Sequence, residues 1–544
     1  MKSKYWSTYV LGSVLSLALA AGAAHAQTLG AADPNIQGDG TLGPAAAKAM
    51  NRGRLLMNEA DEAAKAAATR AAVADAKSAA PSSGPTAEEG GNAPLAAVVG
   101  GHSFAGQNAG NSSPSDATGA VGPFSYIQMI NTSARIYNRN THAIISTATL
   151  NQMAGQAATV NSFDPQIMWD PSTNRFYYVM DSVFSASDNK LSFGFSKTAN
   201  PTNFTTAWCK YQVNYGARFP DYPKLGDSHH FIIIGVNSFQ PSFVGSDIVA
   251  IGKPPAGTTC PATGSFAFGA KLDLRDTSNF QTFTPVPSNQ VDTNATGYVV
   301  TRSGGLPSTR LWFYNVTRSG TGAPVFGNAR GLIVPSYTVP PDASQPTFTQ
   351  VLDTLDGRPT QAVQARNPDR GTVQSFWVQH TVRQPSANLA EVRWYEINPA
   401  PAIPALLRSG SIRSATSHFY NAAISPDRRR DGRTLAFGDS FVIHYNVSGS
   451  ASNLSPRIVA GSSFNGGALG GFALVRNAAG PFRDFTCPSG GQTCRWGDYA
   501  QASPDPRPIF AGRGQVWGTS NYSGVVNPST ALSNFRTWIF DLRP

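Results

Sequence analysis

The stretch FDPQIMWDPSTNRFYYVM, residues 163–180, decides the fold. It opens with the polar pair Asp164-Pro165, continues as an apolar run to Trp169, turns at Asp170-Pro171 and returns as the aromatic run Phe176–Val179. An apolar run and an aromatic run separated by a short turn are typical of two antiparallel strands. The same layout recurs along the chain, so this stretch is one copy of a repeat.

Six other segments share this order of polar cluster, apolar strand, turn and aromatic strand. They begin at Asp116, Asp221, Gly297, Arg358, His418 and Trp496. Copies at intervals of roughly 50 to 80 residues are typical of propeller blades of four antiparallel strands. We therefore predict an all-β, seven-bladed β-propeller over residues 100–544, closed by pairing of the strand Thr537–Phe540 with an N-terminal segment. Six or eight blades also fit the uneven spacing, and a series of β-sandwiches is the structural alternative, although no interdomain linker interrupts the region.

The first hundred residues differ from the repeat region. Residues 1–26 predict a secretory signal peptide, with a basic start, an apolar run and small residues at the cleavage site; an uncleaved membrane anchor is the alternative. Residues 27–99 predict an Ala-rich helix and a flexible linker. No later apolar run reaches the roughly 20 residues that span a bilayer. We expect a secreted or periplasmic monomer without a membrane span.

The four cysteines of an exported chain are most simply joined in two disulfides. Cys487 and Cys494 enclose a Gly-rich hexapeptide that suits a local bridge, which leaves Cys209 with Cys260. A metal site is the weaker interpretation, because no Cys-x-x-Cys pair or histidine cluster accompanies the cysteines. No cofactor is expected, although the loop aspartates and asparagines would allow a structural calcium ion; no EF-hand spacing supports one.

The formal net charge is +10, and residues 1–100 are electrically balanced, so the excess lies on the repeat region. Arginine outnumbers lysine there, which favours planar recognition of carboxylate or sulfate groups. The charge therefore predicts a polysaccharide or glycoconjugate partner, most simply an acidic one. Nucleic acid is not expected, because the chain has no Lys/Arg tract and no nucleic-acid-binding motif. A generally basic, solvated surface is the alternative explanation for most of the arginines.

The innermost strands of a propeller converge on its central channel, so equivalent positions of the repeat predict a site. The residues gathered in this way as catalytic are Asp221, His418, Arg495, Asp498 and Tyr499. Those gathered as substrate-binding are Asp116, Asp164, Tyr222, Lys224, Arg358, Tyr420 and Trp496. Carboxylates, aromatic platforms and cations together are what a glycan site needs.

Structural roles compete with this interpretation. Asp116 and Asp164 would equally cap local turns. Trp496 would equally pack between blades, and His418 would equally serve as a hydrogen-bonded spacer. His380, inside an aromatic strand, is expected in the core.

Glutamate is almost absent from the repeat region, where it occurs only as Glu391 and Glu396, on a strand expected to lie away from the channel. A glycosidase with two carboxylates would then use two aspartates, for which Asp221 and Asp498 are the candidates. Uronate β-elimination would instead use an arginine to neutralise the substrate and Tyr or His to move the proton. Sialidase-type chemistry would use a tyrosine nucleophile with arginines on the substrate carboxylate.

Three motifs, Phe163–Gln166, Phe219–Gly226 and Arg495–Tyr499, resemble the signatures of a family of exported bacterial propeller proteins, mostly without assigned activity. The resemblance covers about residues 110–540 and implies the propeller fold but no reaction. A wider similarity to sialidase-like propellers lacks the complete Asp-box pattern Ser-x-Asp-x-Gly-x-Thr-Trp. We predict an exported propeller that acts on an acidic or polar glycan, as a hydrolase or lyase, at the mouth of the channel. The alternative is a non-catalytic surface or adhesion propeller that binds glycan or protein.

Overall fold

The computed structural model describes most of the repeat region and only fragments of the first hundred residues. The described residues are 35–38, 67, 70, 86–87 and 98–544, without 109–111, 256–258, 368–369, 371–372, 428–439, 488–492, 508–513 and 528–531. The predicted signal peptide and nearly all of the predicted Ala-rich helix lie outside them. The described helices are α2 (Leu150–Ala154) and the single turn η1 (Thr263–Ser265). None of the described helices is long and apolar enough to cross a membrane.

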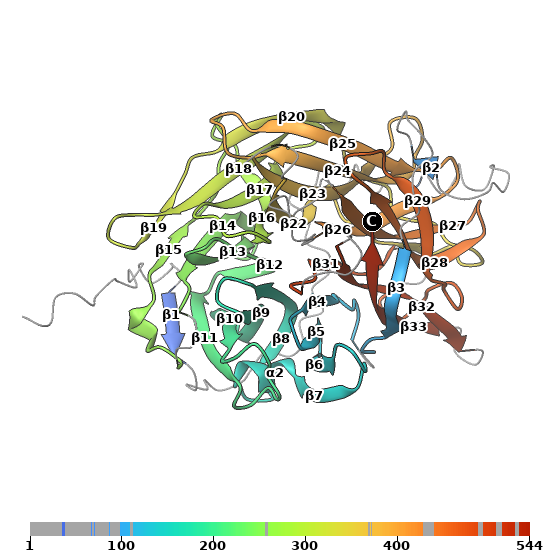
Figure 1. Ribbon diagram of the computed structural model, residues 1–544. Helices are drawn as coiled ribbons and strands as arrows, with labels where there is room; N and C mark the ends of the chain where they lie inside the picture. The colour runs from blue at the N-terminus through green and yellow to red at the C-terminus, as the bar shows by residue number, and fades with distance from the viewer. Residues whose placement is uncertain are drawn as a thin grey trace, which may run out of the picture.

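Within the described residues, seven antiparallel units of four strands follow one another around a common centre (Figure 1). The first strands are β4 (Thr118–Val121), β8 (Asn161–Asp170), β12 (Phe219–Asp227), β16 (Thr282–Gln290), β22 (Pro359–Arg366), β26 (His418–Pro426) and β31 (Gln501–Pro504). The second strands are β5 (Ser125–Ile130), β9 (Arg175–Ser185), β13 (Phe231–Phe239), β17 (Gly297–Ser303), β23 (Gln374–Arg383), β27 (Phe441–Gly449) and β32 (Val516–Asn527).

The outer half of each unit consists of a third and a fourth strand. The third strands are β6 (Ser133–Asn138), β10 (Asp188–Ser196), β14 (Phe243–Gly252), β18 (Ser308–Arg318), β24 (Ala390–Asn398), β28 (Leu454–Ser463) and β33 (Leu532–Arg543). The fourth strands are β7 (Ile144–Thr149), β11 (Trp208–Gly216), β15 (Phe268–Lys271), β19 (Pro324–Phe326) with β20 (Arg330–Tyr337), β25 (Ala405–Arg413), β29 (Gly470–Arg476) and β3 (Val98–Ala105).

Four short strands lie outside this pattern. β1 (Asn35–Gly38) pairs with β11, and β2 (Thr86–Ala87) pairs with β25, so two fragments of the predicted helix-and-linker region add to the outer edges of units. β21 (Val351–Leu352) pairs in parallel with β30 (Thr493–Cys494). This last pairing joins a loop of the fifth unit to the cysteine loop of the seventh.

The hydrophobic core lies between neighbouring units rather than in one central mass. β13 shows why: its residues Phe231–Val236 are apolar at nearly every position. Ile232 and Ile234 pack with residues of the second unit, whereas Phe231 and Ile233 pack with residues of the fourth. Because alternate side chains of a strand point to opposite faces, a strand between two neighbours is apolar on both faces.

The units close into a ring. Each first strand contacts the first strand of the next unit, and β31 contacts β4, which completes the circle. A cluster that includes Tyr126 and Trp517 packs the first unit against the last. The outer strand of the last unit is the N-terminal β3, paired antiparallel with β33. The predicted pairing of Thr537–Phe540 with an N-terminal segment is therefore confirmed, and the arrangement is propeller-like.

The prediction that the fourth copy of the repeat begins with the first strand of its unit is wrong. The segment beginning at Gly297 is the second strand of its unit, and the first strand is β16 (Thr282–Gln290). Pro285 and Pro287 interrupt the apolar pattern of β16, because proline is unfavourable in most strand positions. The predicted strand Thr434–Phe437 lies outside the described residues, and β27 is the second strand of that unit.

Gly226 explains part of the Phe219–Gly226 motif. A Cβ placed on Gly226 would lie 2.6 Å from the backbone of Pro287 and Ser288 in the neighbouring β16. Only glycine allows the two first strands to approach this closely. The motif is therefore at least partly a packing requirement of the ring.

Candidate functional site

Four of the first strands contain a β-bulge at an equivalent position, and each bulge carries a polar side chain. Asp164, Tyr222, Thr284 and Asn421 have positive φ values of 52°, 59°, 58° and 49°. Each lies where the pairing of its first strand with the second strand shifts register. A bulge of this kind bends the strand and redirects a side chain. The repeat therefore fixes a turn of the backbone that brings polar groups of different units together.

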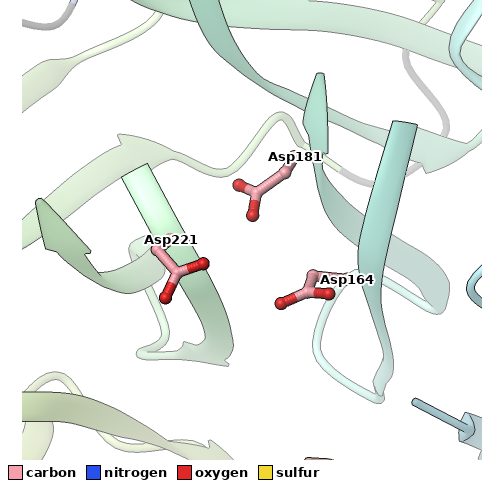
Figure 2. Close-up of side chains that lie close together, drawn as sticks. All are labelled: Asp164, Asp181 and Asp221. Atoms are coloured by element: carbon pink, nitrogen blue, oxygen red, sulfur yellow. The ribbon is translucent and has the colours of Figure 1, made fainter. Parts of the chain in front are cut away.

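Three aspartates form a cluster at one of these bulges. Asp164 comes from β8, Asp181 from β9 and Asp221 from β12, and their carboxylates face one another (Figure 2). One oxygen of each lies within 4.8 Å of the others. Asp181 is fully buried, whereas Asp164 and Asp221 are half-buried. The cluster thus joins the second and third units and is open to solvent on the side of Asp164 and Asp221.

The cluster alters the proton affinity of Asp164. Burial, followed by the neighbouring charges of Asp221 and Asp498, raises the pKa of Asp164 to about 7. A buried carboxyl beside other carboxylates is favoured in its protonated form. Asp164 therefore carries a proton over much of the neutral and acidic pH range and can donate it.

Two tyrosines connect the aspartate cluster to the seventh unit. The Tyr499 hydroxyl donates to Oδ2 of Asp164 at 3.0 Å, and the Tyr222 hydroxyl donates to the backbone oxygen of Asp498 at 2.6 Å. Burial raises the pKa of the Tyr499 hydroxyl well above its ordinary value, so this group acts as a donor. The predicted neighbourhood of the Phe219–Gly226 and Arg495–Tyr499 motifs is thus a direct contact.

Lys224 lies beneath these two rings. Its Nζ is 3.6 Å from the Tyr499 ring centroid and 3.8 Å from that of Tyr222, and it has no hydrogen-bond acceptor among the described residues. Burial lowers the pKa of the Lys224 ammonium well below its ordinary value, against the opposing attraction of Asp164. The two aromatic faces therefore take the place of hydrogen-bond acceptors for this amine.

Asp498 and Asp116 form a second acidic pair next to the cluster. The Asp498 carboxylate binds Nη2 of Arg495 at 2.6 Å, and its backbone N–H donates to Asp116 at 2.8 Å. Asn131 donates to Asp116 at 2.6 Å and accepts from the backbone N–H of Asp164 at 2.7 Å. Burial, together with the charges of Asp498 and Asp164, raises the pKa of Asp116 well above its ordinary value.

Arg358 also lies at the site but already has a partner. Two of its guanidinium nitrogens donate to the Asp356 carboxylate at 2.8 and 2.7 Å. The same guanidinium lies 4.7 Å from the ring centroid of Tyr222. Both arginines predicted to recognise a substrate, Arg358 and Arg495, are therefore ion-paired within the protein.

Three predicted site residues are buried outside the aspartate cluster. His418 accepts at Nδ1 from the backbone N–H of Ala390 in the preceding unit at 3.2 Å. The Tyr420 hydroxyl donates to Ser448 at 3.0 Å. Trp496 is fully buried and donates from its indole nitrogen to Asn446 at 3.0 Å. These contacts fit the packing and spacer roles that compete with catalysis for His418 and Trp496.

Sequence reasoning missed Asp181, Asp356 and Asn131. Asp181 is a carboxylate that directly follows the aromatic and apolar run Phe176–Met180 of β9, a strand that is buried along nearly its whole length. A charged residue inside such a strand is a signal, because lone charges are rarely buried without a role. The alignment of first strands could not find it, since it lies on a second strand.

Other sequence predictions are confirmed. Both disulfides, Cys209–Cys260 and Cys487–Cys494, are present. Glu391 and Glu396 lie on β24, a third strand away from the ring of first strands. His380 is buried, with hydrogen bonds to Gly357 and Tyr395.

The aspartate cluster is also the place where a cation could bind. Carboxylate oxygens from Asp164, Asp181 and Asp221 are hard ligands of the kind that calcium or magnesium prefers. The proton on Asp164 would have to leave first, because only the ionised carboxylate is a good ligand. A metal would therefore compete with the protonated form of the site.

No protein-family model matches the sequence, and no curated protein matches it. Among solved structures, the exo-β-1,3-galactanase from Clostridium thermocellum is 10% identical with a TM-score of 0.30, over 67% of this chain and 83% of the galactanase. A mutant of the Synechocystis apocarotenoid oxygenase is 11% identical with a TM-score of 0.37, over 67% and 74% of the two chains. Drosophila Plexin A in complex with Semaphorin 1b is 7% identical with a TM-score of 0.33, over 82% and 88%. Likenesses this distant support no argument about function, which rests on the geometry above.

Proposed function

We propose that this protein is an exported seven-bladed propeller, of the family that its motifs resemble, and that it hydrolyses a polar glycan at the Asp164–Asp181–Asp221 cluster. The observation that carries the proposal is a half-buried carboxyl with a pKa raised to about 7, within 4.8 Å of two further carboxylates. Paired carboxylates with separated proton affinities are the usual acid and nucleophile of glycosidases. Two disulfides support an oxidising, extracytoplasmic location.

Asp164 and Asp221 take the two roles. Asp164 donates its proton to the leaving oxygen as the glycosidic C–O bond breaks, and Asp221 attacks the anomeric carbon to form a glycosyl ester. Water then cleaves the ester and returns a proton to Asp164. Retaining enzymes place their carboxyl groups about 5 Å apart and inverting enzymes about 6.5 to 9.5 Å apart. A cluster within 4.8 Å therefore favours retention of anomeric configuration.

The geometry favours hydrolysis of a neutral, polar glycan over the other reactions. β-Elimination and sialidase-type chemistry both need a cation that is free to bind the substrate carboxylate. Arg358 and Arg495 are bound to Asp356 and Asp498 instead. The sequence predicts Asp221 and Asp498 as the two catalytic carboxylates of a glycosidase. We propose Asp221 and Asp164 instead, because their carboxylate oxygens lie within 4.8 Å of each other.

A non-catalytic glycan-binding propeller is the second candidate. The observation that favours it is the density of hydrogen bonds and ion pairs within the site, where Asp116, Asp498 and Tyr499 each bind a protein group and only Oδ1 of Asp498, among the oxygens of these three side chains in the described structure, has no hydrogen-bond partner. A satisfied polar network is typical of a rigid binding surface as well as of a preorganised catalyst.

The test is incubation of the purified protein with a panel of neutral, uronic, sulfated and sialylated polysaccharides. We expect new reducing ends from a neutral glycan and no ultraviolet absorbance of unsaturated uronate. Asp164→Asn and Asp221→Asn should each lower the rate by about 10² to 10⁴, whereas Asp188→Asn, at a surface ion pair with Lys190, should leave it unchanged. No cleavage across the panel, with glycan binding that survives both substitutions, would replace hydrolysis by the binding function.

A further inference from the structure

A second hollow lies at the opposite end of the second and third units. Asp164 and Asp221 occur near the start of β8 and β12, and the turns that follow these strands begin six residues later, at Asp170 and Asp227. Six residues of extended strand cover roughly 20 Å. The turns after β8 and β12 are therefore remote from the aspartate cluster.

These turns, with the loop after β14 and the turn after β18, enclose a cavity of about 730 Å³. Its lining includes His229, His230 and Arg318 and contains no aspartate or glutamate. The volume is within the range of about 300 to 1,000 Å³ that holds small ligands. The cavity thus combines the size of a ligand site with an arginine and two imidazoles in its lining.

The hydrogen-bond donors Arg318, His229 and His230 of the lining are available for a ligand. Within the described part of the chain, the side chains of His229, His230 and Arg318 make no hydrogen bond or ion pair, and His229 and Arg318 are exposed. The other cation of the lining, Lys253, is buried and neutralised, with its Nζ 2.8 Å from Asp170 and 2.6 Å from Asp227. Lys253 therefore binds both nearby carboxylates through ion pairs, and the Arg318 guanidinium and the two imidazoles remain for a ligand in the cavity.

The described residues on one wall of the cavity, Pro254, Pro255 and 259–266, are held by contacts with the second unit. Arg175 donates to the backbone oxygen of Pro255 at 3.3 Å, and Tyr211 donates to that of Pro261 at 2.8 Å. The Cys209–Cys260 disulfide ties the same wall to β11. Rings of Pro254, Pro255, Pro261 and Phe266 supply apolar surface to the wall. A fixed wall binds a ligand without a cost for ordering it.

We propose that this cavity binds a sugar-sized molecule that carries a compact oxyanion, either a sulfate or phosphate ester or a carboxylate. Arg318 holds the oxyanion through its planar pair of N–H donors, as guanidinium groups do with such anions. His229 and His230 donate to the remaining oxygens, and the sugar body packs on the proline and phenylalanine rings. This site is separate from the proposed glycan-cleaving site and does not depend on it.

Calorimetric titration of the full protein with glucose 6-phosphate, glucose 6-sulfate, glucuronate and glucose tests the proposal and distinguishes the three anions. We expect saturable binding of at least one anion and none of glucose. Arg318→Gln should weaken the binding by about 10- to 100-fold, the effect of removing a hydrogen bond to a charged group. Arg310→Gln is the matched control, because Arg310 is an exposed arginine on the same strand that does not line the cavity. Equal losses in both variants, glucose binding as tight as that of the anions, or no saturable binding by any of the probes would overturn the proposal.

Discussion

At the residue scale, Asp164 is the group whose properties depend most on its surroundings. It is pushed towards its protonated form by burial, Asp221 and Asp498, and pulled towards its ionised form by the hydroxyl of Tyr499 and the charge of Arg495. The balance raises its pKa to about 7, well above the ordinary value of an aspartate. Both the stability and the proposed activity of the protein should therefore change between acidic and neutral pH.

The raised pKa predicts how stability depends on pH. Between about pH 4 and pH 7 the folded state binds more protons at Asp164 than the unfolded state does, so its contribution to stability falls as the pH rises and is constant above pH 7. Asp164→Asn removes this titration. We expect the melting temperature of the variant, relative to the wild type, to rise as the pH increases from 4 to 7. A pH-independent difference between the two proteins would show that Asp164 titrates normally.

For Tyr499→Phe we expect a shift in the pH dependence of the rate of glycan cleavage, rather than an equal loss of rate at every pH. The Tyr499 hydrogen bond favours the ionised form of Asp164, so its removal raises the pKa of Asp164 further. The rate of glycan cleavage should then begin to fall at a higher pH than in the wild type. Tyr222→Phe is the control, because its hydroxyl donates to the backbone of Asp498 and not to Asp164. An equal shift in both variants would exclude this role for Tyr499.

Part of the site could be predicted from the sequence. The alignment of repeats found Asp164, Asp221, Lys224 and Tyr499, because all four lie on or next to first strands. It could not find Asp181, which lies opposite Phe163 on the neighbouring strand. Nor could it show that Arg358 has a partner, since the geometry that brings Asp356 onto the guanidinium is a property of the folded turn.

At the element scale, the aspartates of the repeat's turns connect neighbouring units. Asp170 and Asp227 bind Lys253 between the second and third units, and Asp427 accepts from the backbone N–H of Gly514 at 3.0 Å between the sixth and seventh. Asp505 forms an ion pair with Arg139, between the seventh unit and the first. These contacts show that the turns connect neighbouring units as well as reverse the direction of the chain.

Asp505→Asn should be strongly destabilising. Both side chains of the Asp505–Arg139 pair are almost completely buried, and Asp505 also accepts from the indole of Trp517 at 3.2 Å. Breaking a buried pair leaves an uncompensated charge, at a cost of about 3 to 5 kcal/mol. Denaturant unfolding measures this loss. Asp188→Asn, at a pair with 38% of the aspartate exposed, should change the free energy of unfolding by less than about 0.5 kcal/mol.

The strands were predictable where alternating or aromatic runs ended at Gly, Pro or Asp, and β16 was missed because Phe283 and Val286 are its only large apolar side chains besides proline. β16 contains Pro285 and Pro287 and still belongs to the ring of first strands. It pairs in parallel with β22 from Ser288 onwards, past both prolines. Pairing with the neighbouring unit therefore stabilises β16 as a strand, although the two prolines give it a low intrinsic strand propensity.

At the scale of the whole molecule, the ring depends on β3. β3 covers the outer edge of β33, and Trp538 donates from its indole to Ser103 at 2.9 Å. An uncovered edge strand exposes a row of backbone donors and acceptors to other chains.

Removal of β3 should therefore cause association. A chain that begins at Gly106 lacks the strand, whereas one that begins at Leu95 retains it. We expect the longer chain to be monomeric in size-exclusion chromatography and the shorter one to unfold at lower temperature and form aggregates. A monomeric shorter chain of unchanged melting temperature would show that the edge of β33 is protected without β3.

The same pairing sets an order of events during synthesis. β3 leaves the ribosome before every first strand, yet its partner β33 emerges after all of them. Until β33 is synthesised, β3 has no partner strand and the last unit of the ring is incomplete. Contacts so distant in sequence form slowly. Ring closure is therefore a step that the chain can take only after β33 has been synthesised.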